Sequence, residues 1–264
     1  MNKQSISEIK NIFTQTQIAQ LPDVISRYES DDRAGVIKLV EGAKKKINKH
    51  LKELSRLDEM FFFEKKYRGE APVICGIDEA GRGPFAGPVV AGAVILPADV
   101  LDRLEDPEGM CIYGLNDSKK VSPKRREELY EEIIDKSVAY GVGMNSPARI
   151  DEINILQATY EAMRRAVEDL GVMPDILLND AVTIPELPIR QVGIVKGDAR
   201  SLSIAAASIV AKVTRDRLMV EYADIYPEYH FEQNKGYGSA EHIRALREHG
   251  PSPIHRRSFI HSYI

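Results

Sequence analysis

From Val73 onward, short apolar runs alternate with amphipathic stretches, and this alternation constrains the fold more than any other feature. The predicted strands cover residues 73–77, 89–96, 138–144, 176–179 and 189–195. The predicted helices begin at Ser122 and Pro123, at about residue 151 (ending near 170), and at about residue 203 (ending near 226). Strands that alternate with helices are typical of an α/β domain, in which helices flank a central sheet.

Residues 1 to about 70 differ from this pattern, because they contain no plausible strand. Ile47, Leu51 and Leu54 recur at helical spacing, and Ser5 with Glu8 has the pattern of a capping box. We therefore expect a helical N-terminal extension over residues 1–70, followed by an α/β domain over residues 71–264 with a helical C-terminal part.

Length and composition fit one large domain with a small appendage. The chain has 264 residues, of which 43% are hydrophobic and 29% charged, as in ordinary globular proteins. Apolar runs such as Val89 to Leu96 fall short of the roughly 18 residues that span a bilayer. The polar N-terminus lacks the core of a signal peptide, so a cytoplasmic protein is expected. Cys75 and Cys111 form no CxxC pair and are predicted to be reduced, packed thiols.

Net charge gives no direct indication of a nucleic-acid ligand. The formal charge is −4, whereas phosphate-binding proteins usually carry a basic face. A basic groove can nevertheless coexist with an acidic site, and the C-terminal segment is locally basic. Its arginines are Arg244, Arg247, Arg256 and Arg257.

The densest cluster of unusual residues is the segment from Gly76 to Pro88, after the first predicted strand. A P-loop needs GxxxxGK[ST] running into a helix, but here Gly81 is followed by Arg82 and Gly83. A dinucleotide-binding turn needs GxGxxG at a helix start, and the two prolines of the segment discourage a helix. A nucleotide-dependent enzyme is therefore disfavoured.

An acidic pair, Asp78 and Glu79, remains at the end of that strand. Neighbouring side chains on a strand point to opposite faces. We therefore expect the pair to converge on one metal only if the strand loosens at its end, which Gly81 would permit. The alternative is that both are solvated loop acids.

Two further acids, Asp180 and Asp198, each follow a predicted strand. Ligands of open α/β sheets gather in crevices at strand ends, so these acids and the first pair are candidates for one site. Carboxylate oxygens suit Mg²⁺ or Mn²⁺ rather than zinc. The six histidines have no ligand spacing and are expected on the surface.

At this point the sequence resembles a known family, bacterial ribonuclease HII. The matching segments are Gly76 to Pro88, Leu115 to Lys120, Lys196 to Asp198, Ile204 to Asp216 and Lys235 to Tyr237. The resemblance covers about residues 73 to 260, and Arg82 stands where related ribonuclease HIII usually carries lysine. It implies a ribonuclease H-like fold, with a central mixed β-sheet flanked by helices. The helical extension before Val73 is absent from the shortest family members.

The resemblance also implies the chemistry. The implied catalytic and metal-binding carboxylates are Asp78, Glu79, Asp180 and Asp198. With two Mg²⁺ or Mn²⁺ ions about 3.5 to 4 Å apart, such a site hydrolyses a phosphodiester to 5′-phosphate and 3′-hydroxyl ends. The substrates would be RNA in RNA–DNA hybrids and single ribonucleotides embedded in duplex DNA, cut on their 5′ side. The role would be ribonucleotide removal from DNA.

Asp216 matches a further acid near the family's site. It is a candidate ligand of the second metal, or a residue that contacts the metal ligands without binding the metal itself. The alternative is a salt bridge on the helix surface with Arg215 or Arg217.

Substrate recognition is expected from two loops. Gly81, Arg82 and Gly83 offer backbone groups to a sugar, because telling RNA from DNA requires contact with the 2′-hydroxyl. Arg82 holds phosphate or forms a structural salt bridge. Tyr237 is expected to stack on a nucleotide sugar, with simple packing as the alternative. The other expected nucleic-acid contacts are Asn116, Ser118, Lys119, Lys120, Lys196 and Lys212.

Two other functions stay open on the sequence. One is a nucleic-acid-binding protein without catalysis, which the four acids disfavour. The other is a ribonuclease H-like nuclease that cuts DNA. We expect a monomer with no membrane partner, and protein partners stay open, including any at the tail Ser258-Phe259-Ile260.

Overall fold

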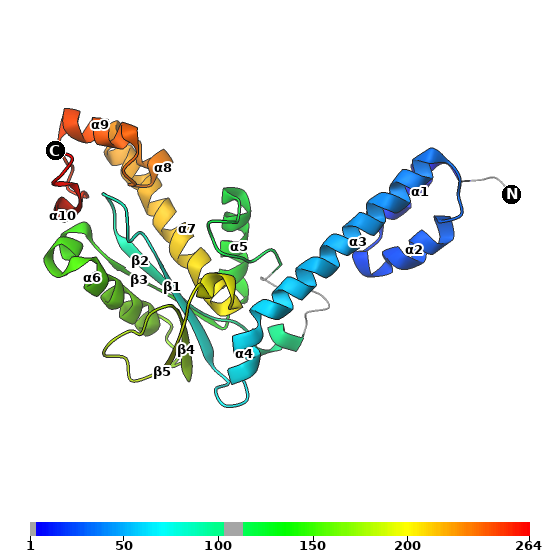
Figure 1. The fold of residues 1–264 in the computed structure, drawn as a ribbon, viewed down its shortest axis with the longest axis horizontal. Coiled ribbons are helices and arrows are strands. Elements are labelled where there is room, and N and C mark those ends of the chain that lie inside the picture. The colour runs from blue at the N-terminus through cyan, green and yellow to red at the C-terminus, as the bar shows by residue number, and fades with distance from the viewer. Residues whose placement is uncertain (1–3, 103–112) are drawn as a thin grey trace. The chain divides into compact units, whose positions relative to one another are not determined.

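The computed structural model describes residues 4–102 and 113–264 (Figure 1). The chain divides into two compact units, Met1–Arg56 and Leu57–Ile264. Each unit has a hydrophobic core of its own, and the sheet lies entirely in the second.

The first unit is helical, as predicted. It contains α1 (Ile6–Gln15), α2 (Leu21–Tyr28) and most of α3 (Ala34–Met60). The predicted capping box begins α1: the Ser5 hydroxyl accepts from the Glu8 amide at 3.2 Å, and the Glu8 carboxylate accepts from the Ser5 amide at 2.7 Å. Apolar side chains from the three helices form the core of this unit, among them Ile9, Leu21 and Val36.

A five-stranded mixed sheet organises the second unit, in the order β3-β2-β1-β4-β5. The strands are β1 (Ile74–Ala80), β2 (Val89–Ile95), β3 (Ala139–Asn145), β4 (Ile176–Asp180) and β5 (Arg190–Ile194). β1, β2 and β3 pair antiparallel, whereas β1–β4 and β4–β5 are parallel. The predicted mixed sheet is therefore confirmed.

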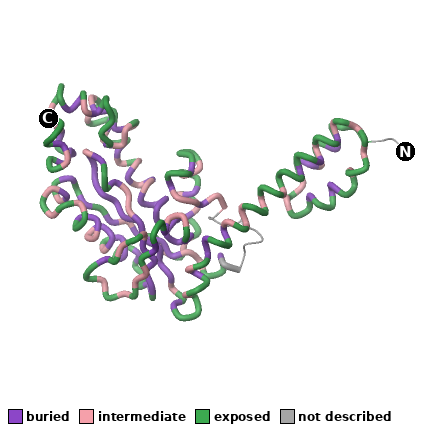
Figure 2. Tube along the Cα trace, in the orientation of Figure 1, coloured by how far each residue is buried: buried purple, intermediate pink, exposed green. Residues whose placement is uncertain are grey.

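Helices cover both faces of the sheet (Figure 1). On one face, α7 (Leu202–Ile225) packs on β1 and β2 beside α5 (Pro123–Lys136), and on the other, α6 (Pro147–Asp169) packs on β2 and β3. β1 and β2 are buried along most of their length (Figure 2). Two glycines let α7 lie close to the sheet: a Cβ on Gly76 would lie 2.0 Å from the Ser203 backbone, and one on Gly92 2.5 Å from the Ala207 carbonyl.

Short elements complete the fold. The remaining helices are α4 (Phe62–Tyr67), α8 (Phe231–Asn234), α9 (Ala240–His249) and α10 (Arg257–Ile260). Short 3₁₀ turns cover Ile18–Gln20, Ala98–Asp102, Gly197–Ala199 and Pro227–Tyr229. Within residues 4–102 and 113–264, no helix has the length and hydropathy needed to cross a membrane.

Two predicted boundaries were wrong. β1 does not end at Ile77 but continues to Ala80, because β2 pairs with it as far as Ala80 and Val90. α6 begins at Pro147 rather than near residue 151, since Ser146 caps it by accepting from the Arg149 amide. The helix also breaks at Asn154, whose φ is 66°.

Cys75 is a buried free thiol, as predicted, and burial raises its pKa to about 12. Cys111 lies outside the described residues. The tail Ser258-Phe259-Ile260 packs on its own chain: Ser258 donates to Asp151 from its backbone amide and hydroxyl, and Ile260 is fully buried.

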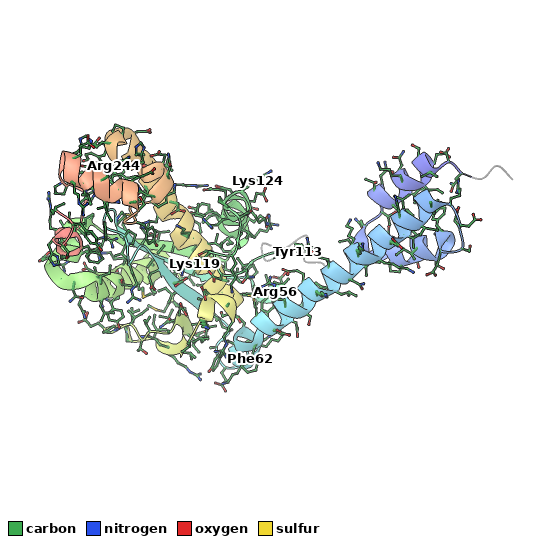
Figure 3. All side chains as sticks on the ribbon, turned by 45° about the horizontal axis from the view of Figure 1, so that its top comes forward. Arg56, Phe62, Tyr113, Lys119, Lys124 and Arg244 are labelled. Carbon is green, nitrogen blue, oxygen red and sulfur yellow. The ribbon has the colours of Figure 1, made fainter. Side chains whose placement is uncertain are left out.

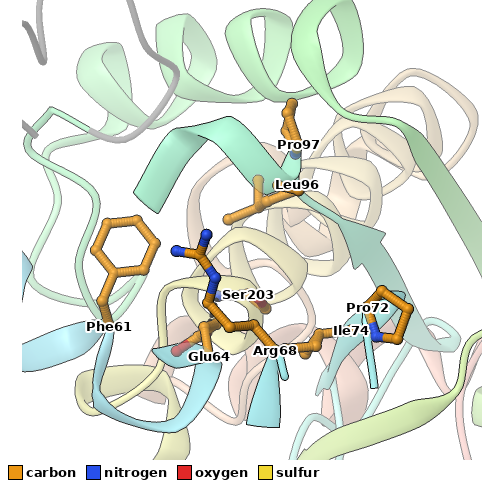
Figure 4. A pocket seen from close by; sticks show the side chains of 9 residues that line it. Phe61, Glu64, Arg68, Pro72, Ile74, Leu96, Pro97 and Ser203 are labelled. Atoms are coloured by element: carbon orange, nitrogen blue, oxygen red, sulfur yellow. Dashed lines mark hydrogen bonds between the residues drawn. The ribbon is translucent and has the colours of Figure 1, made fainter. Parts of the chain in front are cut away.

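A buried carboxyl group joins α4 to the start of α7 (Figure 4). Glu64 is 3% exposed, and its Oε1 accepts from the Ser201 hydroxyl at 2.6 Å and from the Ser203 amide at 2.9 Å. It lines a cavity of about 220 Å³ together with Phe61 and Leu96. Burial raises the pKa of Glu64. This side chain therefore fixes the beginning of the helix that carries several residues of the site described below.

Replacing Glu64 should test this anchor. Glu64→Leu should lower the free energy of unfolding of the second unit by roughly 1 to 3 kcal/mol, because two buried donors lose their acceptor. Glu64→Gln keeps an oxygen in that place and should stay within about 1 kcal/mol of the parent protein. Urea unfolding followed by circular dichroism measures both, and equal stability of the two variants would contradict the assignment.

Candidate active site

The expected acids lie where strands β1 and β4 separate. β4 pairs with β1 only as far as Ile77 and Asn179, so Asp78 and Glu79 extend past the last pair. Asp180 is the final residue of β4. Asp78 and Glu79 still pair with β2, so the strand does not loosen there. Both side chains face the same cavity because β4 no longer pairs with β1 at this point.

A cavity of about 510 Å³ occupies this opening. Its lining residues are Asp78, Glu79, Ala80, Gly81, Arg82, Gly83, Ser118, Lys119, Asp180, Asp198, Ser208, Lys212 and Tyr237. The structure thus brings together all four expected carboxylates, the Gly81–Gly83 turn and Tyr237. The lining comes from β1, β4 and α7 and from three connecting segments: the one before α5, the Gly197–Ala199 turn and the loop after α8.

Asp78 is the most buried of these acids, at 6% exposed. Burial raises its pKa, and the neighbouring carboxylates of Glu79 and Asp180 raise it further. Hydrogen bonds from the Glu79 amide, at 2.8 Å, and from Ser208 on α7 oppose that rise. The Ser208 and Ser118 hydroxyls are themselves joined by a hydrogen bond of 2.9 Å. A cation beside Asp78 would favour its ionised form and so offset this rise in pKa.

Glu79 lies beside Arg82, whose Nη1 is 3.2 Å from its Oε1. Burial nevertheless raises the pKa of Glu79, because the guanidinium only partly offsets the loss of water. Of the two alternatives for Arg82, the structure contains the salt bridge, although the side chain remains 46% exposed and faces the cavity.

Asp180 and Asp198 are held next to each other by backbone geometry. The Gly197 amide donates to Asp180 Oδ1 at 2.7 Å, across a turn in which Lys196 has a left-handed φ of 56°. Burial raises the pKa of Asp198, and so do the nearby charges of Asp117 and Asp180. Asp117 is an acid close to the site that the sequence did not indicate.

The donor set fits hard divalent cations. Four carboxylates supply only oxygen atoms, which Mg²⁺ and Mn²⁺ prefer. The raised pKa values of Asp78, Glu79 and Asp198 come from buried negative charge, which a cation would offset. In the described part of the chain, no three His, Cys, Asp or Glu side chains already form a tight coordination group. The four carboxyl groups are distributed around the lining of the cavity.

Asp216 lies apart from the four acids. It pairs with Lys212 at 2.6 Å and with Arg126 at 3.6 Å, so the expected partners Arg215 and Arg217 were wrong. Asp216 lines a separate groove of about 560 Å³ between α5 and α7. Burial lowers the pKa of Lys212, whereas Asp216 raises it.

The expected phosphate-contacting residues divide into two groups. Lys119, in the segment before α5 (Figure 3), lines the cavity, as do Ser118 and Lys212. The residues outside the cavity lining are Asn116, Lys120 and Lys196. Asn116 and Lys120 instead bond the neighbouring Asp117: the Asn116 side chain accepts from its amide, and Lys120 Nζ lies 3.7 Å from its carboxylate.

Some residues that line the cavity or lie behind it were not predicted from the sequence. Ser208 and Arg215 lie on the face of α7 that Lys212 also occupies, at intervals of four and three residues, so helical spacing could have found them. Arg256 was counted with a basic surface, but it is 0% exposed, and it donates to backbone carbonyls. Arg244, Arg247 and Arg257 remain exposed.

Two histidines were also misplaced, because His242 and His255 are buried rather than on the surface. Their Nε2 atoms lie 2.8 Å apart in a hydrogen bond, and His242 Nδ1 lies 2.9 Å from the carbonyl oxygen of Tyr237. Aromatic rings, including Tyr229 and Phe231, surround the pair. The pair therefore supports the loop that carries Tyr237.

Known structures define the class of this fold. The crystal structure of ribonuclease H2 from Pyrococcus horikoshii aligns with a TM-score of 0.57 and 31% identity, over 70% of this chain and 92% of that one. Ribonuclease HII of Archaeoglobus fulgidus, solved as a complex with PCNA, aligns with a TM-score of 0.57 and 30% identity, over 70% and 93%. Fold and acidic cavity together are those of a ribonuclease H.

Sequence comparison gives the family. The model described as ribonuclease HII matches residues 75–262, and the one described as its N-terminal domain matches residues 5–68. Ribonuclease HII of Lachnoclostridium phytofermentans is 57% identical over 90% of this chain and 89% of its own length. That of Clostridioides difficile is 44% identical over the full length of both. The chain belongs to the ribonuclease HII family, and the predicted resemblance is confirmed.

The buried histidine pair predicts a pH dependence of stability. Burial lowers the pKa of both rings, that of His255 to about 3, whereas histidine in an unfolded chain titrates near 6.5. Between these values the unfolded chain binds protons that the folded chain excludes, so stability should fall as pH falls below about 6.5. Urea midpoints between pH 8 and pH 5 measure this.

His255→Gln should flatten that pH profile, and the matched change at the exposed His261 should leave it unchanged. A His255→Gln profile parallel to that of the parent would assign the acid sensitivity to other groups.

Proposed function

We propose that this chain hydrolyses RNA in RNA–DNA hybrids and cuts on the 5′ side of single ribonucleotides in duplex DNA. The observation that carries the proposal is the shared cavity, in which four carboxylates meet a glycine turn and an exposed tyrosine. Acids alone would serve any metal-dependent nuclease. The turn and the tyrosine add a means of recognising the sugar.

Under this proposal, Asp78, Glu79, Asp180 and Asp198 hold two divalent cations, Mg²⁺ or Mn²⁺. When bound, such ions lower the pKa of a water molecule and stabilise the leaving 3′ oxygen, giving 5′-phosphate and 3′-hydroxyl products. The burial of Asp78 and its bonds to Ser208 and the Glu79 amide fix one carboxylate, and the Gly197 amide fixes Asp180. This preorganisation reduces the rearrangement needed during reaction.

The Gly81–Gly83 turn would select the ribonucleotide. Only RNA carries the 2′-hydroxyl, which both donates and accepts hydrogen bonds. Two residues without a Cβ flank Arg82 and let a sugar approach the backbone. Tyr237 lies next to this turn, since a Cβ on Gly83 would be 3.9 Å from its ring, and the side chain is 48% exposed. Its exposed ring can stack on the sugar of the following nucleotide.

Positive groups around the cavity would hold the phosphate backbone. Arg82, Lys119 and Lys212 reach the cavity directly. Asn116, Lys120 and Lys196 would contact the strand further from the reacting phosphate, while Ser118 supports Ser208. Asp216 would act by orienting Lys212 rather than as a metal ligand. We place this activity in the cytoplasm, in a chain acting as a monomer during ribonucleotide removal from DNA.

The direct test compares one duplex that contains a single ribonucleotide with the same all-deoxy duplex, with Mg²⁺ or Mn²⁺ and then with chelator. The parent protein should cut only the first duplex, 5′ to the ribonucleotide, and only with metal. Asp78→Asn should reduce the rate on the order of 1,000-fold, because it removes a buried negative charge from the metal site but keeps the acceptor for the Glu79 amide.

Asp224→Asn, a change on an exposed part of α7, is the matched control and should keep the parent rate. Cutting of both duplexes would indicate a general nuclease instead. Tight binding without cutting would indicate a protein that binds nucleic acid without catalysis.

Tyr237 provides a separate test of recognition. Tyr237→Ala should slow cutting at an RNA–DNA junction about tenfold, because a stacked aromatic ring contributes about 1 to 3 kcal/mol, and should affect cutting within a long RNA strand less. Tyr237→Phe keeps the ring and should stay close to the parent. Equal losses of Tyr237→Ala on both substrates would mean that the ring only packs.

A further inference from the structure

Two buried arginines hold the backbone of the Gly81–Pro88 turn from behind. Arg256 donates to carbonyls near both ends of the turn. Its Nη2 donates to the Gly81 carbonyl at 2.6 Å and its Nη1 to the Arg82 carbonyl at 2.9 Å, while its Nε donates to the Gly87 carbonyl at 3.0 Å. Arg215, on α7, donates to the carbonyls of Ala86 at 3.0 Å and Pro88 at 2.9 Å. We call these two side chains the arginine clamp.

Both clamp residues are buried to an unusual degree for arginine. Arg256 is 0% exposed and Arg215 is 1% exposed. Removing a guanidinium from water is costly unless its donors find acceptors, and these donors are satisfied by backbone carbonyls of the turn. A planar group with donors in fixed directions also fixes the directions of the carbonyls that it binds. The clamp therefore sets the orientation of the peptide groups, not just their position.

That orientation has a consequence for the amides of the turn. In a trans peptide the C=O and the following N–H point in opposite directions. The Gly81 carbonyl accepts from Arg256, so the N–H of Arg82 points away from the Arg256 side chain. The Arg82 carbonyl also accepts from Arg256, so the N–H of Gly83 points away from that side chain as well. Arg256 lies buried behind the turn, while Arg82 and Gly83 line the cavity. The two amides thus face the side from which a sugar approaches.

The same clamp reaches the loop that carries Tyr237. Arg215 Nη1 donates to the Lys235 carbonyl at 3.0 Å. The amide of Phe85, within the turn, donates to the Gly236 carbonyl at 2.8 Å, and the Arg256 amide donates to the Phe85 carbonyl at 2.8 Å. Both elements that would recognise the sugar therefore share one support.

We propose that Arg256 and Arg215 are positioning residues for ribonucleotide selection, which act by directing the amides of Arg82 and Gly83 into the cavity. Neither side chain touches the substrate. The proposal rests on the proposed function, since it assigns the origin of its sugar specificity. It predicts that a weakened clamp impairs discrimination between ribose and deoxyribose more than it impairs binding of duplex DNA.

The experiment compares the parent protein with Arg256→Lys and Arg256→Gln. Binding of the single-ribonucleotide duplex and of its all-deoxy counterpart is measured by fluorescence anisotropy in Ca²⁺, and cleavage of the first duplex in Mg²⁺. The Kd for the all-deoxy duplex should stay within about twofold, whereas the preference for the ribonucleotide duplex should fall about tenfold in Arg256→Gln, as expected for about 1.4 kcal/mol of lost hydrogen bonding. kcat should fall about 100-fold, because small misplacements near a reacting group have effects of that size.

Arg256→Lys keeps a charge and part of the hydrogen bonding, so it should recover part of both losses. Arg164→Gln is the matched control: Arg164 also donates to a backbone carbonyl, that of Pro185 at 3.2 Å, but on α6 away from the cavity. It should change neither Kd nor kcat. A purely structural role of Arg256 would lower the thermal midpoint and weaken both duplexes equally, which would overturn the proposal.

If neither Arg256 variant keeps a cooperative unfolding transition, hydrogen exchange of the parent protein decides. The Arg82 and Gly83 amides should be protected by the ribonucleotide duplex more than by the all-deoxy duplex, and equal protection would overturn the proposal. A parent protein that does not distinguish the two duplexes would refute the proposed function itself. A parent that does so, with an Arg256→Gln variant that is folded and equally selective, would refute only the clamp.

Discussion

The burial of Asp78 among other acids is the constraint on which the rest of the second unit depends. A carboxylate that is 6% exposed and faces like charges is costly, and its raised pKa reflects that cost. The fold bears the cost because α7 lies close to the sheet, over Gly76 and Gly92, and so brings Ser208 to the carboxylate. Glu64 fixes the first turn of the same helix. The position of α7 on the sheet and the burial of Asp78 therefore depend on each other.

The acids and the two buried arginines have separate places in this arrangement. The acids face the cavity, where a cation can meet them, whereas Arg215 and Arg256 face the backbone behind the turn. The arginines do not neutralise the acids, which would remove the attraction for a cation. They are stabilised by carbonyl dipoles instead. The net charge of −4 averages over both sets and therefore says little about either.

Much of this could be predicted from the sequence, because strand periodicity and strand-end acids are local features. Asp78 and Asp180 were expected together because ligands of open α/β sheets gather in crevices at strand ends, and in the structure β1 and β4 run parallel. What failed depends on distant packing. The pairing of β2 with β1 keeps Asp78 in a regular strand. The burial of His242, His255 and Arg256 is decided by the helices after α7, and nothing local distinguishes these residues from surface ones.

The clamp also orders events in time. Arg256 binds a carbonyl 175 residues earlier in the chain. At a synthesis rate of about 5 to 20 residues per second, roughly 9 to 35 s separate the two on the ribosome. During that interval the nascent chain already carries Asp78 and the glycine turn, but Arg256 is not yet available to bind the turn. Bringing together groups this distant in sequence also costs loop-closure entropy, which slows folding. Under the proposed role of the clamp, selectivity for the sugar would be among the last properties that a new molecule acquires.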